Sequence, residues 1–549
     1  MSTINGTAGN DTINGTIYAD TIHGGDGNDT ISADDGSGGY SPESGNDHLY
    51  GDGGDDTLYA PAYRNGVLDG GDGNDHIVAG NGGHQTLIGG AGSDLIEGSG
   101  GDYIVGYGGP GHPSNSDHDT LNGSIGNDVI VAHLGDTING GPNFYWDTDT
   151  LILYGDTATE GLTANFMDLA LGATKTIGGS PITSIEYISF LSLTNFDDNV
   201  TAGIVPPDRY SAGVTMLGLD GNDTLTGTYA VDTISGGNGN DVIYGGTIDT
   251  GFFVPPSKDQ LSGDDGDDII HAGTKPVMES GGNGDDALYG GEGHDDLYGG
   301  SGADMLSGGT GNDHLYGQSA NGGADGADSL SAGDGSDYLQ GNAGNDTLDG
   351  GLGSDRINGG ADNDTIVAGD GNDTVNGNLG NDTIDGGAGQ DSLRGGKDDD
   401  LIAGGDGDDT LLGDLGNDTL EGGHGQDVMT GGGGADLFVF NRFAGSTGDT
   451  SPTSPLTDEI TDFVQGSDKI ELAFVPTAIL TGSSVDAAHA ITDAHALMSG
   501  HAGSHEVAAM QVGGDTYLVS SGSGGSDLAE LAIKLDGVNA GTMTTSDFV

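Results

Sequence analysis

The fold of this chain is decided by a nine-residue unit, one clean copy of which is Gly24-Gly25-Asp26-Gly27-Asn28-Asp29-Thr30-Ile31-Ser32. The unit reads Gly-Gly-x-Gly-x-Asp-x-apolar-x. Its first six residues have turn chemistry, because glycine adopts the positive φ angles that tight turns need. Its last three residues can form a short strand with one apolar side chain pointing inward. Stacked copies would therefore bury a thin, continuous core.

The unit recurs in an unbroken register over the second half of the chain. Two residues after each repeat aspartate comes an apolar residue, from Leu339 to Phe438. A disordered acidic chain has no reason to keep such a register, so the pattern predicts a folded repeat array. The twelve aspartates of this run are Asp337, Asp346, Asp355, Asp364, Asp373, Asp382, Asp391, Asp400, Asp409, Asp418, Asp427 and Asp436.

Earlier blocks of the sequence carry the same unit with interruptions. An insertion at 317–322 lengthens one step of the array, and loops interrupt the register between Asp47 and Asp128. Gln85 stands where an aspartate is expected, so we expect no carboxylate ligand there. Asp259 keeps the nine-residue spacing to Asp268. The predicted ligands of these blocks are Asp11, Asp20, Asp29, Asp47, Asp56, Asp223, Asp232, Asp241, Asp268, Asp286, Asp295, Asp304, Asp313 and Asp328.

The residue types of the unit are those of a calcium site. Glycine lets backbone carbonyls approach an ion, the aspartate adds a carboxylate, and these hard oxygens are the ligands that Ca²⁺ prefers. The chain has 113 Gly, and its 87 acidic residues comprise 76 Asp and only 11 Glu. Mere solubility would not require this excess of Asp, which favours turns and ligation. In the regular run we also predict ligation at the first-position glycines Gly341, Gly350, Gly377, Gly386, Gly404, Gly413 and Gly422.

The nonapeptide resembles that of the RTX (repeats-in-toxin) calcium-binding proteins. This resemblance implies an all-β fold, a parallel β-roll in which each coil uses two nonapeptides and calcium lies between turns stacked on the same side. Asp362 and Asp398 replace the fourth glycine, but Asp tolerates left-handed backbone, so we expect these turns to form. Ala332 and Ala368 replace a first glycine.

The carboxyl-terminal segment 441–549 resembles the serralysin-like terminal domain of RTX proteins exported by type I secretion. The resemblance implies a β-rich cap with an uncleaved export signal and an extracellular location. We divide the rest of the chain into interrupted repeats at 1–141, a wider non-repeat β segment at 142–218, interrupted repeats at 219–322 and the regular roll at 323–440. The cluster Phe144, Tyr145 and Trp146 is interpreted as junction packing, with sugar stacking as the alternative.

Several classes of function are disfavoured by composition. The chain has no cysteine, which excludes disulfides and thiolate metal sites. Its formal net charge of −76 argues against nucleic acid and anionic lipid as partners. No apolar run approaches the roughly 18 residues of a membrane span. The first residues lack the basic and apolar regions of a cleaved signal peptide.

We expect no enzyme activity. His505-Glu506 begins like a zinc-protease helix, but Ala509 stands where the second histidine would be. A Gly-x-Ser-x-Gly motif is absent, and the pair Asp267-Asp268 fits a calcium turn. The repeats begin by residue 6, leaving no room for a preceding catalytic domain. The cluster His489, His495, His501 and His505 is interpreted as a polar loop insertion, with a transition-metal site as the alternative.

These patterns predict folding that depends on calcium, because stacked carboxylates repel one another until cations neutralise them. Three classes of role stay open. The first is a structural surface-layer, matrix or adhesion protein, with cell-surface polysaccharide or further copies of itself as partners. The second is a secreted toxin-like effector that acts on a host. The third is a hydrolase with an unrecognised site, for instance in residues 142–218.

Overall fold

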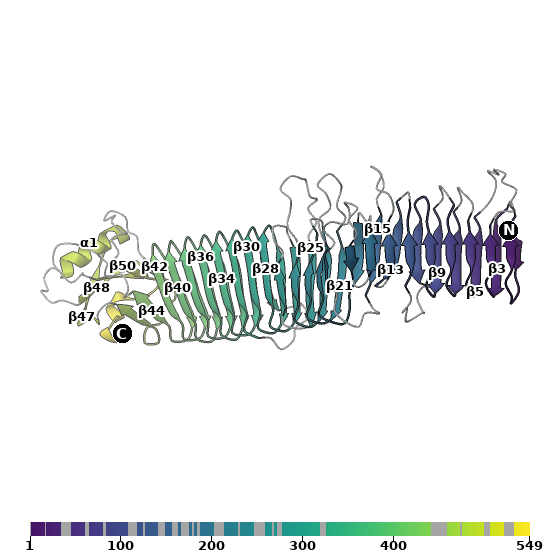
Figure 1. The fold of residues 1–549 in the computed structure, drawn as a ribbon. Coiled ribbons are helices and arrows are strands. Elements are labelled where there is room, and N and C mark those ends of the chain that lie inside the picture. Colours follow the sequence, from purple (N-terminus) through teal and green to yellow (C-terminus); the bar gives the residue numbers. More distant parts are fainter. Residues whose placement is uncertain are drawn as a thin grey trace. The chain divides into compact units, whose positions relative to one another are not determined.

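The computed structural model describes residues 2–16, 18–33, 46–60, 65–80, 84–107, 118–124, 127–134, 136–140, 149–155, 163–165, 175–177, 180–183, 187–202, 213–228, 231–245, 259–265, 268–271, 277–318, 326–440, 458–472, 475–498, 506–520 and 532–549. They belong to two compact units, Met1–Glu279 and Ser280–Val549, which are described separately. In each unit, short parallel strands stack coil upon coil (Figure 1). The predicted all-β parallel solenoid is therefore confirmed. No described helix is long and apolar enough to cross a membrane.

In the first unit, successive coils pair through two sets of strands. One set is β1 (Ser2–Asn5), β3 (Asp20–Asp26), β5 (His48–Gly53), β7 (Val67–Asp72), β9 (Thr86–Ala91), β11 (Tyr103–Tyr107), β13 (Val129–His133), β15 (Thr150–Tyr154), β19 (Tyr187–Ser192), β21 (Thr215–Asp220), β23 (Thr233–Asn238) and β25 (Asp259–Asp265). Each of these strands is parallel to the next. Strands β15 and β19 come from the non-repeat segment, which thus continues the same stack.

The second set of the first unit consists of shorter strands. They are β2 (Thr12–Asn14), β4 (Thr30–Ser32), β6 (Thr57–Tyr59), β8 (His76–Val78), β10 (Leu95–Glu97), β12 (Thr120–Asn122), β14 (Thr137–Asn139), β18 (Ser180–Thr183) and the antiparallel β17 (Lys175–Ile177), followed by β16 (Thr163–Asn165), β20 (Asn199–Thr201), β22 (Thr224–Thr226), β24 (Val242–Tyr244) and β26 (Ile269–His271). Strand β27 (Val277–Asn283) contains the division between the units.

The second unit contains the regular run, and its strands alternate between two sheets. The odd-numbered strands are β29 (Asp296–Ser301), β31 (His314–Gln318), β33 (Tyr338–Ala343), β35 (Arg356–Ala361), β37 (Thr374–Leu379), β39 (Ser392–Lys397), β41 (Thr410–Leu415) and β43 (Val428–Gly433). The even-numbered strands are β28 (Ala287–Glu292), β30 (Met305–Thr310), β32 (Ser329–Asp334), β34 (Thr347–Leu352), β36 (Thr365–Asp370), β38 (Thr383–Ala388), β40 (Leu401–Asp406), β42 (Thr419–His424), β44 (Leu437–Phe440) and β46 (Lys469–Leu472). Each coil thus uses two nonapeptides.

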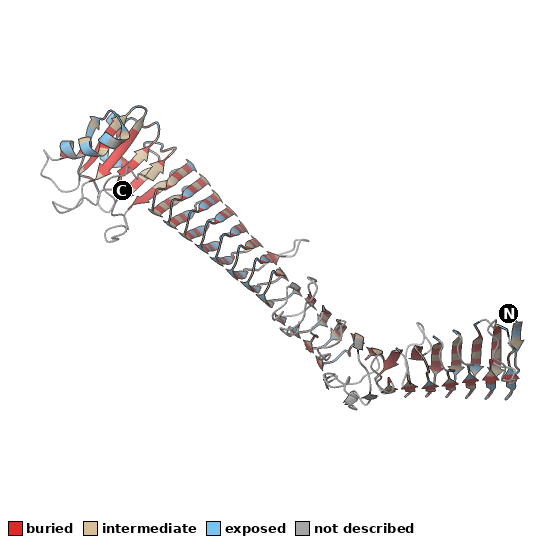
Figure 2. Ribbon diagram, turned by 90° about the horizontal axis from the view of Figure 1, so that it is seen from above, coloured by how far each residue is buried: buried red, intermediate tan, exposed pale blue. Residues whose placement is uncertain are grey.

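The core of each coil is a single apolar side chain per strand. Leu339, Leu348 and Ile402 are fully buried, and the residues on either side of each point outward because side chains alternate along a strand. Figure 2 shows this alternation as bands of buried and exposed residues along the stacked strands. The eighth position of the repeat therefore forms the predicted thin core.

The stacking of coils leaves almost no space beside the turn glycines. Gly405 has a φ of 107°, and a Cβ added there would lie 2.0 Å from the carbonyl oxygen of Gly387 in the preceding coil. Asp362 and Asp398 adopt φ angles of 75° and 73°, so the two aspartates at glycine positions do take left-handed backbone as expected. Ala332 and Ala368 are also accommodated, both fully buried.

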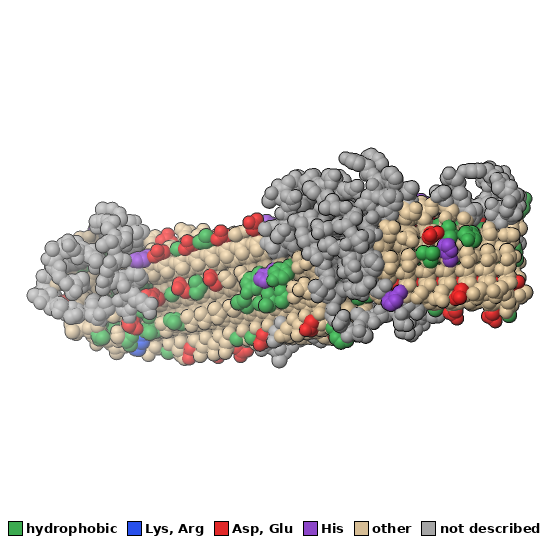
Figure 3. Space-filling model, viewed as in Figure 1, with side chains coloured by type: hydrophobic (Ala, Val, Ile, Leu, Met, Phe, Trp, Pro, Cys, Tyr) green, Lys and Arg blue, Asp and Glu red, His purple; other side chains and the backbone are tan. Residues whose placement is uncertain are grey.

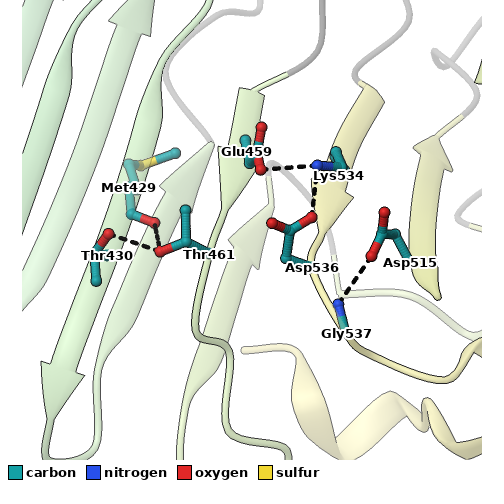
Figure 4. Close-up of polar contacts among 8 residues, drawn as sticks. All are labelled: Met429, Thr430, Glu459, Thr461, Asp515, Lys534, Asp536 and Gly537. Carbon is teal, nitrogen blue, oxygen red and sulfur yellow. Dashed lines mark hydrogen bonds and ion pairs between the residues drawn. The ribbon is translucent and has the colours of Figure 1, made fainter.

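The roll ends in a cap that continues its hydrogen bonding. Strand β45 (Asp458–Ile460) is parallel to β43 on one side and to β50 (Ala532–Leu535) on the other. Lys534 lies 2.8 Å from Glu459 and 2.5 Å from Asp536, and Thr430 of β43 hydrogen-bonds Thr461 at 2.7 Å (Figure 4). The remaining cap elements are β47 (Ala478–Ser483), α1 (Ala487–Met498), β48 (Glu506–Val512), β49 (Asp515–Ser520) and the short 3₁₀ turns Ala540–Thr542 and Thr545–Asp547.

The interpretation of the histidine cluster as a polar loop is wrong for residues 487–498, which form helix α1. Ala490, Ala494 and Met498 give the helix an apolar face that packs on β48 and β49. His489 lies on the exposed side, 2.6 Å from Asp486. His501 and His505, like the aromatic cluster at 144–146, lie outside the described residues.

Substituting Gly405 by alanine should destabilise the roll, because the new Cβ meets a backbone carbonyl and the φ angle is unfavourable for alanine. We expect the free energy of unfolding in saturating calcium to fall by about 2 kcal/mol or more. Gly433→Ala is the matched control, since its Cβ would meet nothing closer than a leucine methyl at 3.4 Å. Urea titrations of both variants measure the difference. Equal stabilities would contradict the stacking argument.

Candidate metal centres

The repeat aspartates link the coils through one carboxylate oxygen. In the regular run, from Asp346 onward, Oδ1 of each aspartate accepts a hydrogen bond from the backbone N–H of the aspartate 18 residues earlier; Asp337 accepts from Asp313, 24 residues earlier. Asp373 donates to Asp391 at 2.8 Å, Asp391 donates to Asp409 at 2.9 Å, and Asp409 donates to Asp427 at 3.0 Å. Two such ladders run along the roll, one at each turn edge.

The other oxygen of ten of these twelve carboxylates is buried without a hydrogen-bond partner. It lies beside the first-position glycine of the same repeat, where an added Cβ would be 2.2 Å from Oδ2 of Asp382 at Gly377 and 2.6 Å from Oδ2 of Asp409 at Gly404. The other five predicted glycines have the same relation to their aspartates. The aspartates of the run with such an Oδ2 include Asp337, Asp355, Asp364, Asp373, Asp382, Asp391, Asp400, Asp409, Asp418 and Asp427.

Burial makes these carboxylates hard to ionise in the folded chain. Loss of solvent raises the pKa of Asp364 to about 8, and that of Asp400 and Asp427 to about 7. The hydrogen bond from the ladder N–H lowers the pKa of Asp364 and so opposes this shift. The negative charges of neighbouring aspartates raise the pKa further. A cation beside Oδ2 would remove both the desolvation cost and the repulsion.

The donor set fits calcium. Buried carboxylate oxygens and glycine-flanked carbonyls are hard oxygen ligands, and a charged oxygen without a partner is costly unless a cation meets it. In the described part of the chain, no three His, Asp or Glu side chains gather around one point. An ion at the turns would therefore depend on backbone carbonyls as well as on one or two carboxylates, which explains why the motif contains so much glycine.

Three predicted ligands differ from the rest. Oδ2 of Asp20 accepts hydrogen bonds from the backbone N–H and the hydroxyl of Thr16, both at 2.7 Å. Thr7 holds Oδ2 of the half-exposed Asp11 in the same way. The backbone N–H of Thr228 donates to Oδ2 of Asp232 at 2.7 Å, and its hydroxyl donates to Oδ1 at 2.8 Å. Each threonine stands four residues before its aspartate. These turns already satisfy the oxygen that has no partner in aspartates such as Asp373 and Asp409.

The remaining predicted aspartates are buried at the ladder position, and the structure adds others that the sequence analysis did not include. Gln85 stands at a ladder position with an uncharged side chain. Its backbone N–H donates a hydrogen bond to Oδ1 of Asp102 at 2.8 Å. Each added aspartate precedes a core residue by two positions, a signal that survives even where the glycines are lost. They are Asp75, Asp94, Asp102, Asp119, Asp128, Asp136, Asp149, Asp198, Asp259, Asp458 and Asp468.

Replacing one buried carboxylate should weaken calcium-dependent folding. We expect Asp391→Asn to lower the stability of the calcium-loaded protein by about 1–3 kcal/mol, because the amide keeps the ladder hydrogen bond but loses the charged ligand. Asp370→Asn, at an exposed turn position, is the matched control. Calcium titrations followed by circular dichroism measure the midpoint, and an unchanged midpoint for Asp391→Asn would exclude a ligand role.

The raised pKa values also predict how an ion-free fold responds to pH. Burial raises the pKa of Asp382 to about 6 and that of Asp364 to about 8, both above the value of an unfolded carboxyl. Such groups stabilise the fold most fully below about pH 4 and lose this contribution as pH rises through 6 to 8. In chelator, the β signal at low protein concentration should therefore decrease over that range. A signal that instead increases with pH would contradict the assigned shifts.

Comparison with known proteins agrees with this chemistry. The family model described as RTX calcium-binding nonapeptide repeat (4 copies) matches residues 5–39, 43–60, 64–82, 79–109, 114–142, 217–247, 257–274, 280–315, 298–321, 322–357, 349–384, 358–393, 376–411, 385–420 and 403–438. No curated protein matches. The solution structure of the AlgE6R3 subunit from the Azotobacter vinelandii mannuronan C5-epimerase is 31% identical over 29% of this chain and 78% of that chain, with a TM-score of 0.21. Since the family model covers more than half of the chain, this protein belongs to the RTX calcium-binding nonapeptide repeat family.

Proposed function

We propose that this chain is an exported structural protein that folds when it meets extracellular calcium. The observation that carries the proposal is the row of buried carboxylates whose Oδ2 atoms have no partner. A folded chain without cations would bury a charged or protonated carboxylate in every nonapeptide of the regular run. Export through a type I system without a cleaved signal, as the resemblance of segment 441–549 implies, is part of the proposal.

The energetics of the coil favour a chain that is unfolded until calcium binds. Each nonapeptide buries only one apolar side chain, so its hydrophobic stabilisation is small. Fixing the backbone of its nine residues costs conformational entropy at every position. The backbone hydrogen bonds and one core residue leave little to offset the buried charges. Calcium that bridges stacked turns would neutralise them, so that its binding free energy becomes folding free energy.

The threonine-held turns add a detail to this proposal. At Asp20 and Asp232 the chain itself supplies the donors, so these turns can close without an ion. We propose that calcium occupies the glycine turns with a free Oδ2 and that the threonine turns act as ion-independent links between them. Asp11, Asp20 and Asp232 would then be structural residues of the ladder.

The direct test is circular dichroism of the whole chain at pH 7.5, first in chelator and then with calcium at about 1–10 mM, above the range of extracellular calcium modules. We expect a largely disordered spectrum in chelator and a β spectrum with calcium. Magnesium at the same concentration is the control, because it prefers smaller octahedral sites. A chain that is already β-rich in chelator at this pH would overturn the proposal.

The structural role needs a separate measurement on cells that produce the protein. We expect the chain to stay on the washed cell surface in calcium and to be released by chelator. Fractionation with an antibody measures the two pools. Protein that is fully soluble in the medium at every calcium concentration would instead support a secreted effector.

A further inference from the structure

The regular roll has two outer faces, which we name by their strands. The odd face consists of the side chains immediately before and after the fully buried residue in β29 to β43, and the even face consists of the same two positions in β28 to β42. On each strand the fully buried residue separates two outward positions, so a strand contributes two side chains to its face. Strands β34 and β35 belong to one coil, as do β38 and β39, so every coil contributes to both faces.

The two faces differ in charge between β33 and β42. On the odd face, β29 contributes Asp296, whereas β33 to β39 contribute only neutral or basic side chains: Tyr338, Gln340, Arg356, Asn358, Thr374, Asn376, Ser392 and Arg394. On the even face, β34, β38 and β42 contribute Asp349, Asp385 and Glu421, and β32 to β42 contribute no Lys or Arg. On the side of the molecule shown in Figure 3, acidic side chains are scattered over the described surface and Lys or Arg is nearly absent. An asymmetry of this kind is notable in a chain with only 11 basic residues.

The opposite charges occur in the same coils. Asp349 and Arg356 lie in the coil formed by β34 and β35, and Asp385 and Arg394 lie in the coil formed by β38 and β39. All four side chains are exposed. The two coils are two strand spacings apart, about 9.6 Å. A copy displaced sideways, without a shift along the roll, would therefore place each base over a strand that carries an acid.

Apolar side chains also occur on both faces of the same coils. On the odd face Tyr298 and Tyr316 stack with ring centroids 4.8 Å apart. The same two coils carry Tyr289 and the 43%-exposed Met305 on the even face. Further along, Leu401, which is 48% exposed on the even face, shares its coil with Leu412 on the odd face. Apolar positions thus face apolar positions in the same sideways arrangement that pairs the charges.

We propose that the Ser280–Val549 unit binds a second copy of this chain, the odd face of one copy against the even face of the next, with the coils in register. The inference rests on the proposed calcium-dependent fold and identifies the partner of the folded protein. Because the two contact surfaces differ, the arrangement does not close into a dimer and adds copies in rows. Stacked sheets of this kind lie about 10 Å apart, within reach of an Arg–Asp pair.

The size of the faces is sufficient for such contact. Eight strands of about six residues, at a spacing of about 4.8 Å and a rise of about 3.3 Å per residue, give each face roughly 38 Å by 20 Å. This footprint is close to the roughly 800 Å² per partner of a standard specific interface. We therefore expect association in the micromolar range rather than an obligate complex.

Arg394 can bind a side chain of a neighbouring copy in addition to its partner in its own chain. Its Nε bonds Asp414 near the end of strand β41, while the guanidinium is 55% exposed and has four further N–H donors. A groove of about 550 Å³ adjoins it, lined by Gly360, Asn376, Asn378, Gly396 and Lys397 among others. Glycines at two of these positions leave room for a side chain of the neighbouring copy.

Sedimentation velocity of the full chain in calcium tests the proposal. We expect the average mass to rise with protein concentration and to fall when salt is raised from about 0.05 to 0.5 M, because exposed charges are screened. The double variants Arg356→Glu/Arg394→Glu and Asp349→Arg/Asp385→Arg should each weaken association about tenfold or more, since like charges then face each other. Asp334→Arg/Asp370→Arg makes the same charge change as the second variant at exposed turn edges and should associate like the wild type.

Mixing the two face variants is the decisive measurement. The acidic odd face of the first variant matches the basic even face of the second, and the reverse contact matches as well. We expect an equimolar mixture to regain association that neither variant shows alone. Wild type that stays monomeric up to about 100 µM, or a mixture that does not recover, would overturn the proposal.

Circular dichroism of the same samples separates the possible failures. A β spectrum in calcium with no association contradicts only the face-to-face contact. A disordered spectrum in calcium contradicts the proposed fold trigger itself. Association that is equal in all variants would mean that another surface is used, and an acidic glycan that binds only chains with Arg356 and Arg394 would identify a different occupant of the odd face.

Discussion

A carboxylate buried in every nonapeptide is the constraint on which the rest of this structure depends. One oxygen of each aspartate accepts the N–H of the coil before it, and this bond fixes the register in which coils stack. In most coils of the regular roll the second oxygen is left beside a glycine, buried and without a donor. These coils therefore contain a built-in requirement for positive charge. Calcium fits it because carboxylate and backbone carbonyl oxygens are the hard ligands it prefers.

The glycines follow from the same constraint. A side chain at the first position would meet the carboxylate of its own repeat, and one at the second or fourth position would meet a carbonyl of the preceding coil. Asp362 and Asp398 show that the left-handed turn tolerates an aspartate when its side chain can point outward. Glycine thus serves close stacking more than flexibility, and where another residue takes positive φ in the regular roll it is Asn or Asp, at Asn342, Asp362, Asn378, Asp398 and Asp414.

The cap completes the ladders instead of merely covering the last coil. Asp427 donates to Asp458 at 3.1 Å and Asp436 donates to Asp468 at 3.2 Å, so both rows of aspartates end on residues of the cap. Asp468 in turn accepts the N–H of Val464 at 2.7 Å, which leaves its carboxylate satisfied by the chain. The cap offers a finished coil edge on which calcium-bound coils can stack, and it removes the open strand edge that would otherwise pair with other chains.

The sequence by itself determined the coil. The order of glycines, aspartate and apolar residue is a local pattern, and local backbone preference plus one buried side chain per strand are enough to predict the parallel solenoid and the residues of its ladders. Aspartates of the interrupted coils, such as Asp149 and Asp198, would have been found by asking only for an apolar residue two positions later. Helix α1 was not foreseen, because its histidines suggested a polar loop and its apolar face is evident only once β48 and β49 are in place. Only the tertiary structure decided which carboxylate oxygens are held by a threonine and which lack a partner, since that depends on the path of each turn.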